Sequence, residues 1–313
     1  MARVILHLGT HKTGSTSLQR ALDASRADLL GAGWLYPMSG RQIRKRAPEP
    51  RAMALSLLPP DRSTFRAAVA ALLSEIEDSA SPNVILSSEA WCRSSKAESL
   101  AAVVTAMRAA GHSTEGVLYL RNRALYGRSR YREWTQNWRN ALPLPEYVAR
   151  NAPAFDYIAL CQRMRDLFGA DLHVRSYERA GNLPEDFARM LGLPELAKQP
   201  RANPSLDAVQ TEVQRLANAR GLDLPGGTRS MDEIFGDQDF WTARRDYGEA
   251  LDIPILNPAR PMVRRLRQAT GFDGEATAYL LRPPDPPRHD IRSLSPCLER
   301  VLAAHAARLE PAS

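Results

Sequence analysis

A short loop near the start of the sequence, residues 9–17, combines the residue types that bind phosphate and sulfate groups. Its glycines let an anion approach the backbone amides, its hydroxyls donate hydrogen bonds, and its lysine supplies a positive charge. The residues expected to contact the anion are Lys12, Thr13, Gly14, Ser15, Thr16 and Ser17. The spacing differs from the GxxxxGK[ST] loop of nucleotide triphosphatases, because Lys12 precedes Gly14 and the sequence contains no Gly-Lys pair.

A second candidate anion contact follows a different apolar segment. Arg121 comes directly after the run Gly116–Leu120, and Ser129 follows Arg121 by eight residues. A guanidinium group forms strong paired hydrogen bonds with a dianionic phosphate, and a nearby hydroxyl adds a neutral one. Arg121 and Ser129 are therefore candidates for contacts with an anionic group.

Two side chains near this loop have the chemistry of a general base. Glu89 ends the apolar run that begins at Val84, so it should lie at the same sheet edge as Lys12. His11 lies inside the loop itself and is the alternative. We expect no metal site, because the six histidines are scattered and the three cysteines are widely spaced.

These residues need a scaffold of alternating strands and helices. Short apolar runs predict strands over 3–8, 84–89, 116–120 and 172–177, and helical spacing predicts helices over 17–30, 62–79, 96–110 and 121–140. Alternation of this kind favours an α/β fold, in which a parallel sheet is covered on both faces and ligands bind at the carboxyl ends of the strands. The basic run 41–46 is expected to lie in a surface loop.

The pattern changes after about residue 200. Residues 205–220 read as a helix, and the remainder has the irregular spacing of loops. We therefore predict a core over 1–200 and a helical or irregular extension over 201–313 that packs on that core, so that the chain forms one domain overall.

Together, the motifs resemble those of sulfotransferases that use PAPS (3′-phosphoadenosine 5′-phosphosulfate). The run from His7 to Gln19 is similar to the 5′-phosphosulfate loop of bacterial members, and Arg121 with Ser129 is similar to the 3′-phosphate motif. A weaker likeness is Val174–Glu178, which resembles a strand ending in Tyr-Glu. The resemblance spans residues 3–195, and Arg123 stands where the family often has proline.

The resemblance implies a three-layer α/β sandwich with a central parallel sheet, related to P-loop nucleotide triphosphatases. It further implies sulfuryl transfer by in-line displacement from PAPS to a hydroxyl or amine of a carbohydrate, lipid or small molecule, without an obligatory metal. Lys12 and the loop would hold the phosphosulfate, Arg121 and Ser129 the 3′-phosphate. Some members of the family use a glutamate as base and others a histidine, so Glu89 and His11 both stay open.

Composition and charge limit the class of protein, its expected location and its partners. The chain has 313 residues, 44% of them hydrophobic and 25% charged, which is typical of a folded globular protein. Without a signal-like segment or a long apolar run, we expect a cytoplasmic protein, and a homodimer is compatible with the sequence. The net charge of +7 suits a polyanionic ligand. A P-loop kinase or nucleotide triphosphatase and a non-catalytic nucleotide- or polyanion-binding protein are the alternatives, whereas nucleic acid is not expected as a partner.

Overall fold

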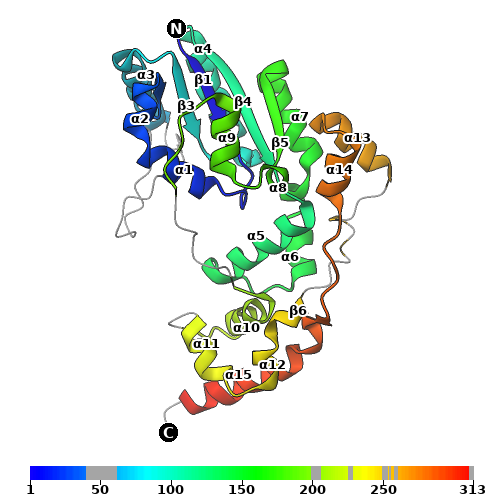
Figure 1. Ribbon diagram of the computed structural model, residues 1–313. Coiled ribbons are helices and arrows are strands. Elements are labelled where there is room, and N and C mark those ends of the chain that lie inside the picture. Colours follow the sequence, from blue (N-terminus) through cyan, green and yellow to red (C-terminus); the bar gives the residue numbers. More distant parts are fainter. Residues whose placement is uncertain are drawn as a thin grey trace. The chain divides into compact units, whose positions relative to one another are not determined.

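The structure is a computed structural model of the whole chain (Figure 1). It describes residues 1–39, 62–198, 206–224, 228–248, 253, 255–256 and 260–309. These residues divide into two compact units, which we describe separately. The first unit contains residues 1–122, 156–202 and 260–280, and the second contains residues 123–155, 203–259 and 281–313.

A five-stranded parallel sheet forms the centre of the first unit. The order across the sheet is β2-β3-β1-β4-β5, and each neighbouring pair of strands is parallel. The strands are β1 (Arg3–His7), β2 (Trp34–Leu35), β3 (Asn83–Ser87), β4 (Ser113–Leu120) and β5 (Leu172–Ser176). The central strands are short apolar runs with almost no exposed side chain, as expected of a parallel sheet buried on both faces.

Helices cover both faces of this sheet (Figure 1). Ile5, Ile85 and Val117 point to one face, where they pack with side chains of α1 (Ser15–Ala24), α2 (Arg26–Gly31) and α9 (Leu183–Leu191). The opposite face lies against α4 (Ala97–Ala109) and α7 (Tyr157–Phe168). On β4, Gly116 leaves room for Phe168, because an added Cβ atom would approach that ring to 2.9 Å. The predicted α/β class, with a parallel sheet between two helical layers, is confirmed.

The remaining elements of the first unit complete the cover and the connections. Their bounds are α3 (Arg62–Ser79), η1 (Glu89–Cys92), η2 (Ser94–Lys96), η4 (Gly169–Asp171), α8 (Tyr177–Ala180), α13 (Arg260–Thr270) and α14 (Gly274–Leu281). The helix predicted over 17–30 is two helices that meet at Ser25, and the two-residue strand β2 was not predicted. The basic run 41–46 lies outside the described residues.

The second unit is mainly helical. Its elements are α5 (Arg123–Asn137), α6 (Leu144–Arg150), η3 (Ala152–Phe155), α10 (Ala208–Ala219), α11 (Thr228–Phe235), α12 (Asp239–Thr242), η5 (Arg244–Asp246), β6 (Tyr247–Gly248), β7 (His289–Asp290), η6 (Ile291–Ser293) and α15 (Ser295–Leu309). The expectation of irregular structure after residue 220 is wrong, because α11, α13, α14 and α15 lie there. Residues 123–155 group with the second unit and residues 260–280 with the first, so the two units interleave along the chain and differ from the predicted division at residue 200.

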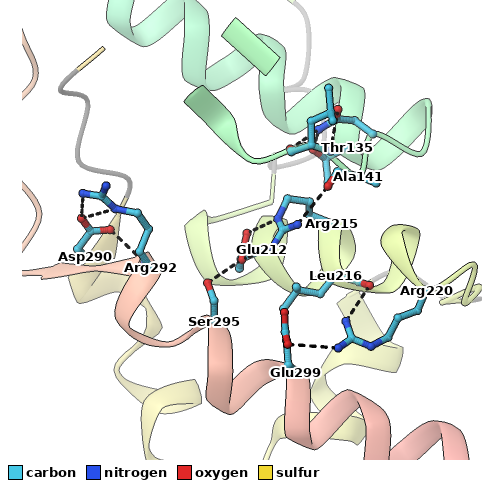
Figure 2. Close-up of polar contacts among 12 residues, drawn as sticks. Thr135, Ala141, Glu212, Arg215, Leu216, Arg220, Asp290, Arg292, Ser295 and Glu299 are labelled. Atoms are coloured by element: carbon cyan, nitrogen blue, oxygen red, sulfur yellow. Dashed lines mark hydrogen bonds and ion pairs between the residues drawn. The ribbon is translucent and has the colours of Figure 1, made fainter. Parts of the chain in front are cut away.

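Helix α10 occupies the centre of the second unit. Its apolar face packs with α11 and α15 around Val213, Leu216 and Leu302. A polar cluster joins α10 to α15, as Figure 2 shows: Arg215 donates two hydrogen bonds of 2.8 and 2.7 Å to Glu212, and Ser295 Oγ donates a third of 2.8 Å to that carboxylate. Both partners of the ion pair are largely buried, and their mutual hydrogen bonds compensate the desolvation of the two charges.

Among the described residues, no helix is both long enough and apolar enough to cross a lipid bilayer.

Candidate anion-binding and active site

The sequence-predicted residues of the first unit meet at the carboxyl edge of its sheet. Strand β1 lies between β3 and β4, and its register pairs His7 with Ser87 on one side and Val117 on the other. The chain continues from β1 toward β2 and β3 and later crosses to β4 and β5, so the strand order reverses at β1. Open α/β sheets bind ligands at such a reversal point, outside the carboxyl ends of the strands.

The backbone of the loop after β1 is shaped to hold an anion. Lys12 and Gly14 have left-handed conformations, with φ of 66° and 78°. Among the residues that the structure describes, no acceptor is found for the amides of Thr13, Gly14, Ser15 and Thr16, and helix α1 has no side-chain cap at its N-terminus. Consecutive amides of this kind form an anion-binding concavity, and the dipole of the following helix adds positive potential.

The side chains of the loop have different orientations. Ser15 Oγ is buried and has no hydrogen-bond partner within the described part of the chain, whereas Thr13 Oγ1 donates to the carbonyl of Thr10 at 2.5 Å. Thr16 and Ser17 are exposed on the first turn of α1. A Cβ atom on Gly9 would come within 2.8 Å of both Ser15 Oγ and Thr13 Oγ1, so only glycine leaves room for these two hydroxyls.

Arg121 lies beside the loop. Its NH1 group donates a 2.8 Å hydrogen bond to the carbonyl of Lys12, and its Nε lies 3.7 Å from Glu178 Oε1. Glu178 also accepts two hydrogen bonds from the amide of Asn122, at 2.9 and 3.1 Å. Burial raises the pKa of Glu178, and the Asn122 amide and the Arg121 charge oppose that rise in part. Arg121 therefore supports the strained backbone at Lys12 besides adding positive charge to the site.

Glu89 follows β3 at the start of η1 and is attached to helix α1. Gln19 Nε2 donates a 3.0 Å hydrogen bond to Glu89 Oε2. His11, the alternative base, accepts a 2.9 Å hydrogen bond at Nε2 from Arg93 Nε. Because that bond occupies the Nε2 lone pair next to a positive charge, the arrangement favours Glu89 as the proton acceptor.

A buried polar group lies beneath the loop. His7 Nδ1 is 2.8 Å from Ser87 Oγ, and its ring contacts Tyr119 and Phe187. Complete burial lowers the pKa of His7 to about 3, so the imidazole is neutral at pH 7. His7 is thus a structural residue of the sheet. Because its imidazole is neutral, it adds no positive charge to an anion site.

The structure brings together the predicted loop residues, Glu89, His11 and Arg121. Ser129 lies on α5 in the second unit, and its pairing with Arg121 stays a prediction. Sequence reasoning assigned no role to Gln19, Ser87, Arg93 or Glu178. A buried polar residue on the apolar face of the predicted first helix was the available signal for Gln19. Within the described part of the chain, no group of three or more His, Cys, Asp or Glu side chains could hold a metal ion.

Comparison with known proteins gives one structural likeness. No protein-family model matches the sequence, and no curated protein matches it. Among solved structures, a sulfotransferase from Alicyclobacillus acidocaldarius is similar to this chain, with 15% sequence identity and a TM-score of 0.39. The alignment covers 78% of this chain and 100% of that one. The α/β class assigned above rests on the strand order and register of this chain.

Proposed function

We propose that this chain is a sulfotransferase that moves the sulfuryl group of PAPS to a hydroxyl, or an amine, of a carbohydrate, lipid or small-molecule acceptor. The observation that carries the proposal is the row of four amides, Thr13 to Thr16, that have no acceptor among the described residues. Lys12 lies in the same loop, and Glu89 is hydrogen-bonded to the helix that begins there. A phosphosulfate group suits the amides, and the carboxylate suits an acceptor that must lose a proton.

The proposed reaction needs three contributions from the protein. The acceptor oxygen attacks sulfur while the bond between sulfur and the 5′-phosphate oxygen breaks, and the electron pair of that bond leaves with PAP (3′-phosphoadenosine 5′-phosphate). Lys12 and the loop amides stabilise the negative charge that develops on the bridging and sulfuryl oxygens. Glu89 takes the proton of the acceptor hydroxyl. Arg121 holds the Lys12 carbonyl and binds the 3′-phosphate.

The first test is binding of PAP, measured as a thermal shift. A ligand at one hundred times its Kd stabilises a protein by about 2.7 kcal/mol, which raises the Tm of a chain of this size by about 4 °C. At the same PAP concentration Lys12→Ala should reduce that rise to about half or less, and Lys96→Ala on η2 is the control that should keep it. A wild-type Tm unchanged by PAP would contradict the proposal. A rise with ATP and magnesium instead would favour a nucleotide triphosphatase or kinase.

A second test separates the two roles of Arg121. PAP and AMP differ by the 3′-phosphate, whereas both need the loop that Arg121 supports through the Lys12 carbonyl. If Arg121 contacts the 3′-phosphate, Arg121→Met should weaken binding of PAP much more than binding of AMP. An equal loss for both nucleotides would assign Arg121 to the support of the loop alone.

A third test asks whether the site is catalytic. Glu89→Gln keeps the shape of the side chain and removes its capacity to accept a proton. We expect PAP affinity within about twofold of wild type and turnover reduced by a factor on the order of 10² to 10⁴, the usual contribution of a general base. Turnover equal to wild type would remove Glu89 from the mechanism and return the role to His11.

A further inference from the structure

A buried glutamine joins the helix of the anion loop to Glu89. Gln19 is 3% exposed, and its Nε2 lies 3.0 Å from Glu89 Oε2 and 3.3 Å from Ser87 Oγ. We propose that Gln19 is a positioning residue, which holds Glu89 so that its other oxygen, Oε1, receives the proton of the acceptor. This inference rests on the proposed function, because the orientation of Glu89 matters to catalysis only if Glu89 is the base.

The surroundings of Gln19 determine which way its amide points. A carboxylate can only accept hydrogen bonds, so the group that faces Glu89 must be the NH2 of the amide. The same nitrogen lies near Ser87 Oγ, which gives each of its two hydrogens an oxygen acceptor. In the opposite orientation, the amide oxygen would face the carboxylate, and that contact would be repulsive.

The sheet anchors this arrangement from below. Ser87 lies opposite His7 in the register of β3 and β1, and its Oγ is 2.8 Å from His7 Nδ1. Since His7 is neutral at pH 7, Nδ1 can accept the Ser87 hydroxyl hydrogen, which leaves the Ser87 oxygen to accept from Gln19. Gln19 therefore contacts β3 directly and β1 through Ser87, and its hydrogen bond to Glu89 fixes one end of the carboxylate.

The geometry has a consequence for the path of the proton. Gln19 engages Oε2, and Oε1 has no hydrogen-bond partner among the described residues. An amide N–H cannot take up a proton, so the proton of the acceptor stays on Glu89 after the transfer. One O–H bond of the acceptor breaks and one forms at Oε1, while the S–O bond to the acceptor forms and the S–O bond to PAP breaks.

Three variants test this role, with water as the acceptor and release of PAP from PAPS as the readout. Gln19→Leu removes both donors at similar size, Gln19→Glu places a second carboxylate against Glu89, and Gln162→Leu on the exposed surface of α7 is the matched control. We expect both Gln19 variants to lower kcat by about 10- to 100-fold, a part of what a general base contributes. The KM for PAPS and the thermal shift with PAP should stay within twofold.

The pH profile distinguishes positioning from a packing role. A hydrogen bond to a carboxylate favours its charged form, and a neighbouring carboxylate disfavours it. The acidic limb of the kcat profile should therefore move to higher pH in Gln19→Leu and further in Gln19→Glu. Because Gln19→Glu preserves the shape of the side chain, it also serves if Gln19→Leu does not fold.

The outcomes separate this inference from the proposed function. If Glu89→Gln loses turnover while Gln19→Leu and Gln19→Glu keep the wild-type kcat and pH profile, the positioning role is overturned and the sulfotransferase proposal stands. If wild type neither binds PAP nor turns over PAPS, the proposed function fails, and the role of Gln19 fails with it.

Discussion

The left-handed backbone at Lys12 allows its charge and its conformation to be tested apart. At a φ of 66°, a residue with a Cβ atom is strained by about 1–2 kcal/mol, and glycine is not. Glycine also makes the unfolded chain more flexible, which costs about 0.4–1 kcal/mol. We therefore expect Lys12→Gly to be more stable than Lys12→Ala by about 0.5–1 kcal/mol, although both lack the same side chain.

The two variants should nevertheless bind PAP equally poorly. Each loses the ammonium group, and a hydrogen bond to a charged group contributes about 1.5–3 kcal/mol. This loss corresponds to a Kd for PAP about 10- to 100-fold above that of wild type. Stability and affinity therefore change independently at this position, which is unusual for a loop residue.

Urea unfolding gives the free energies, and isothermal titration calorimetry gives the Kd values. Gln162, exposed in the interior of α7, is the control, because at an ordinary helical position the glycine variant should be less stable than the alanine variant. If Lys12→Gly were less stable than Lys12→Ala, the assignment of a strained left-handed backbone to Lys12 would be wrong. If Lys12→Gly bound PAP like wild type, Lys12 would not be part of the anion site.

Three further predictions follow from contacts in the first unit. Gly9→Ala should raise the Kd for PAP at least tenfold by calorimetry, because the added Cβ atom would lie 2.8 Å from two loop hydroxyls; an unchanged Kd would mean that these hydroxyls move aside. Because burial lowers the pKa of His7 from 6.5 to about 3, the unfolded state binds its proton more readily, so stability is complete above pH 6.5 and is lost as the pH falls toward 3. Between pH 7.5 and 5 this loss is about 2 kcal/mol in urea unfolding, and His7→Gln should remove it; parallel pH curves for the two proteins would refute the assignment. Asp186→Ala should cost about 2–3 kcal/mol, because it leaves the Arg175 guanidinium and the buried Tyr119 hydroxyl without their carboxylate; a loss below 1 kcal/mol would show that water replaces it.

The strand-loop-helix at the start of the chain is predictable from the sequence because its signals are local. The run Val4–Leu6 is apolar throughout, the next residues are rich in glycine and hydroxyls, and apolar spacing of helical period follows. The same reasoning places Glu89 and Arg121 after buried strands, and the parallel sheet brings both to one edge. The two-residue strand β2 escaped prediction because so short a segment has no periodicity to detect.

The helices after residue 220 show the limit of local patterns. In α13, three of the four residues Arg264–Arg267 are arginines. Few residues, Leu266 among them, form the apolar side of this helix. A short helix of this kind is stable through packing on a neighbour, and Arg165 of α7 donates a hydrogen bond to the carbonyl of Ala269. Its partner lies about a hundred residues earlier in the sequence, where no local signal points to it.

The sequence by itself determined which chemical groups this protein carries and which strand ends hold them. Only the tertiary structure decided how these groups pair, because pairing depends on strand order and register. Gln19 reaches Glu89 across 70 positions of sequence, and Arg121 reaches the Lys12 carbonyl across 109. Those contacts support the proposal of Glu89 over His11 as the base, since Glu89 keeps an oxygen without a partner among the described residues while His11 already accepts a hydrogen bond from Arg93. Residue type and spacing are properties of the chain, whereas a hydrogen bond exists only where folding brings its two partners within 3 Å or so of each other.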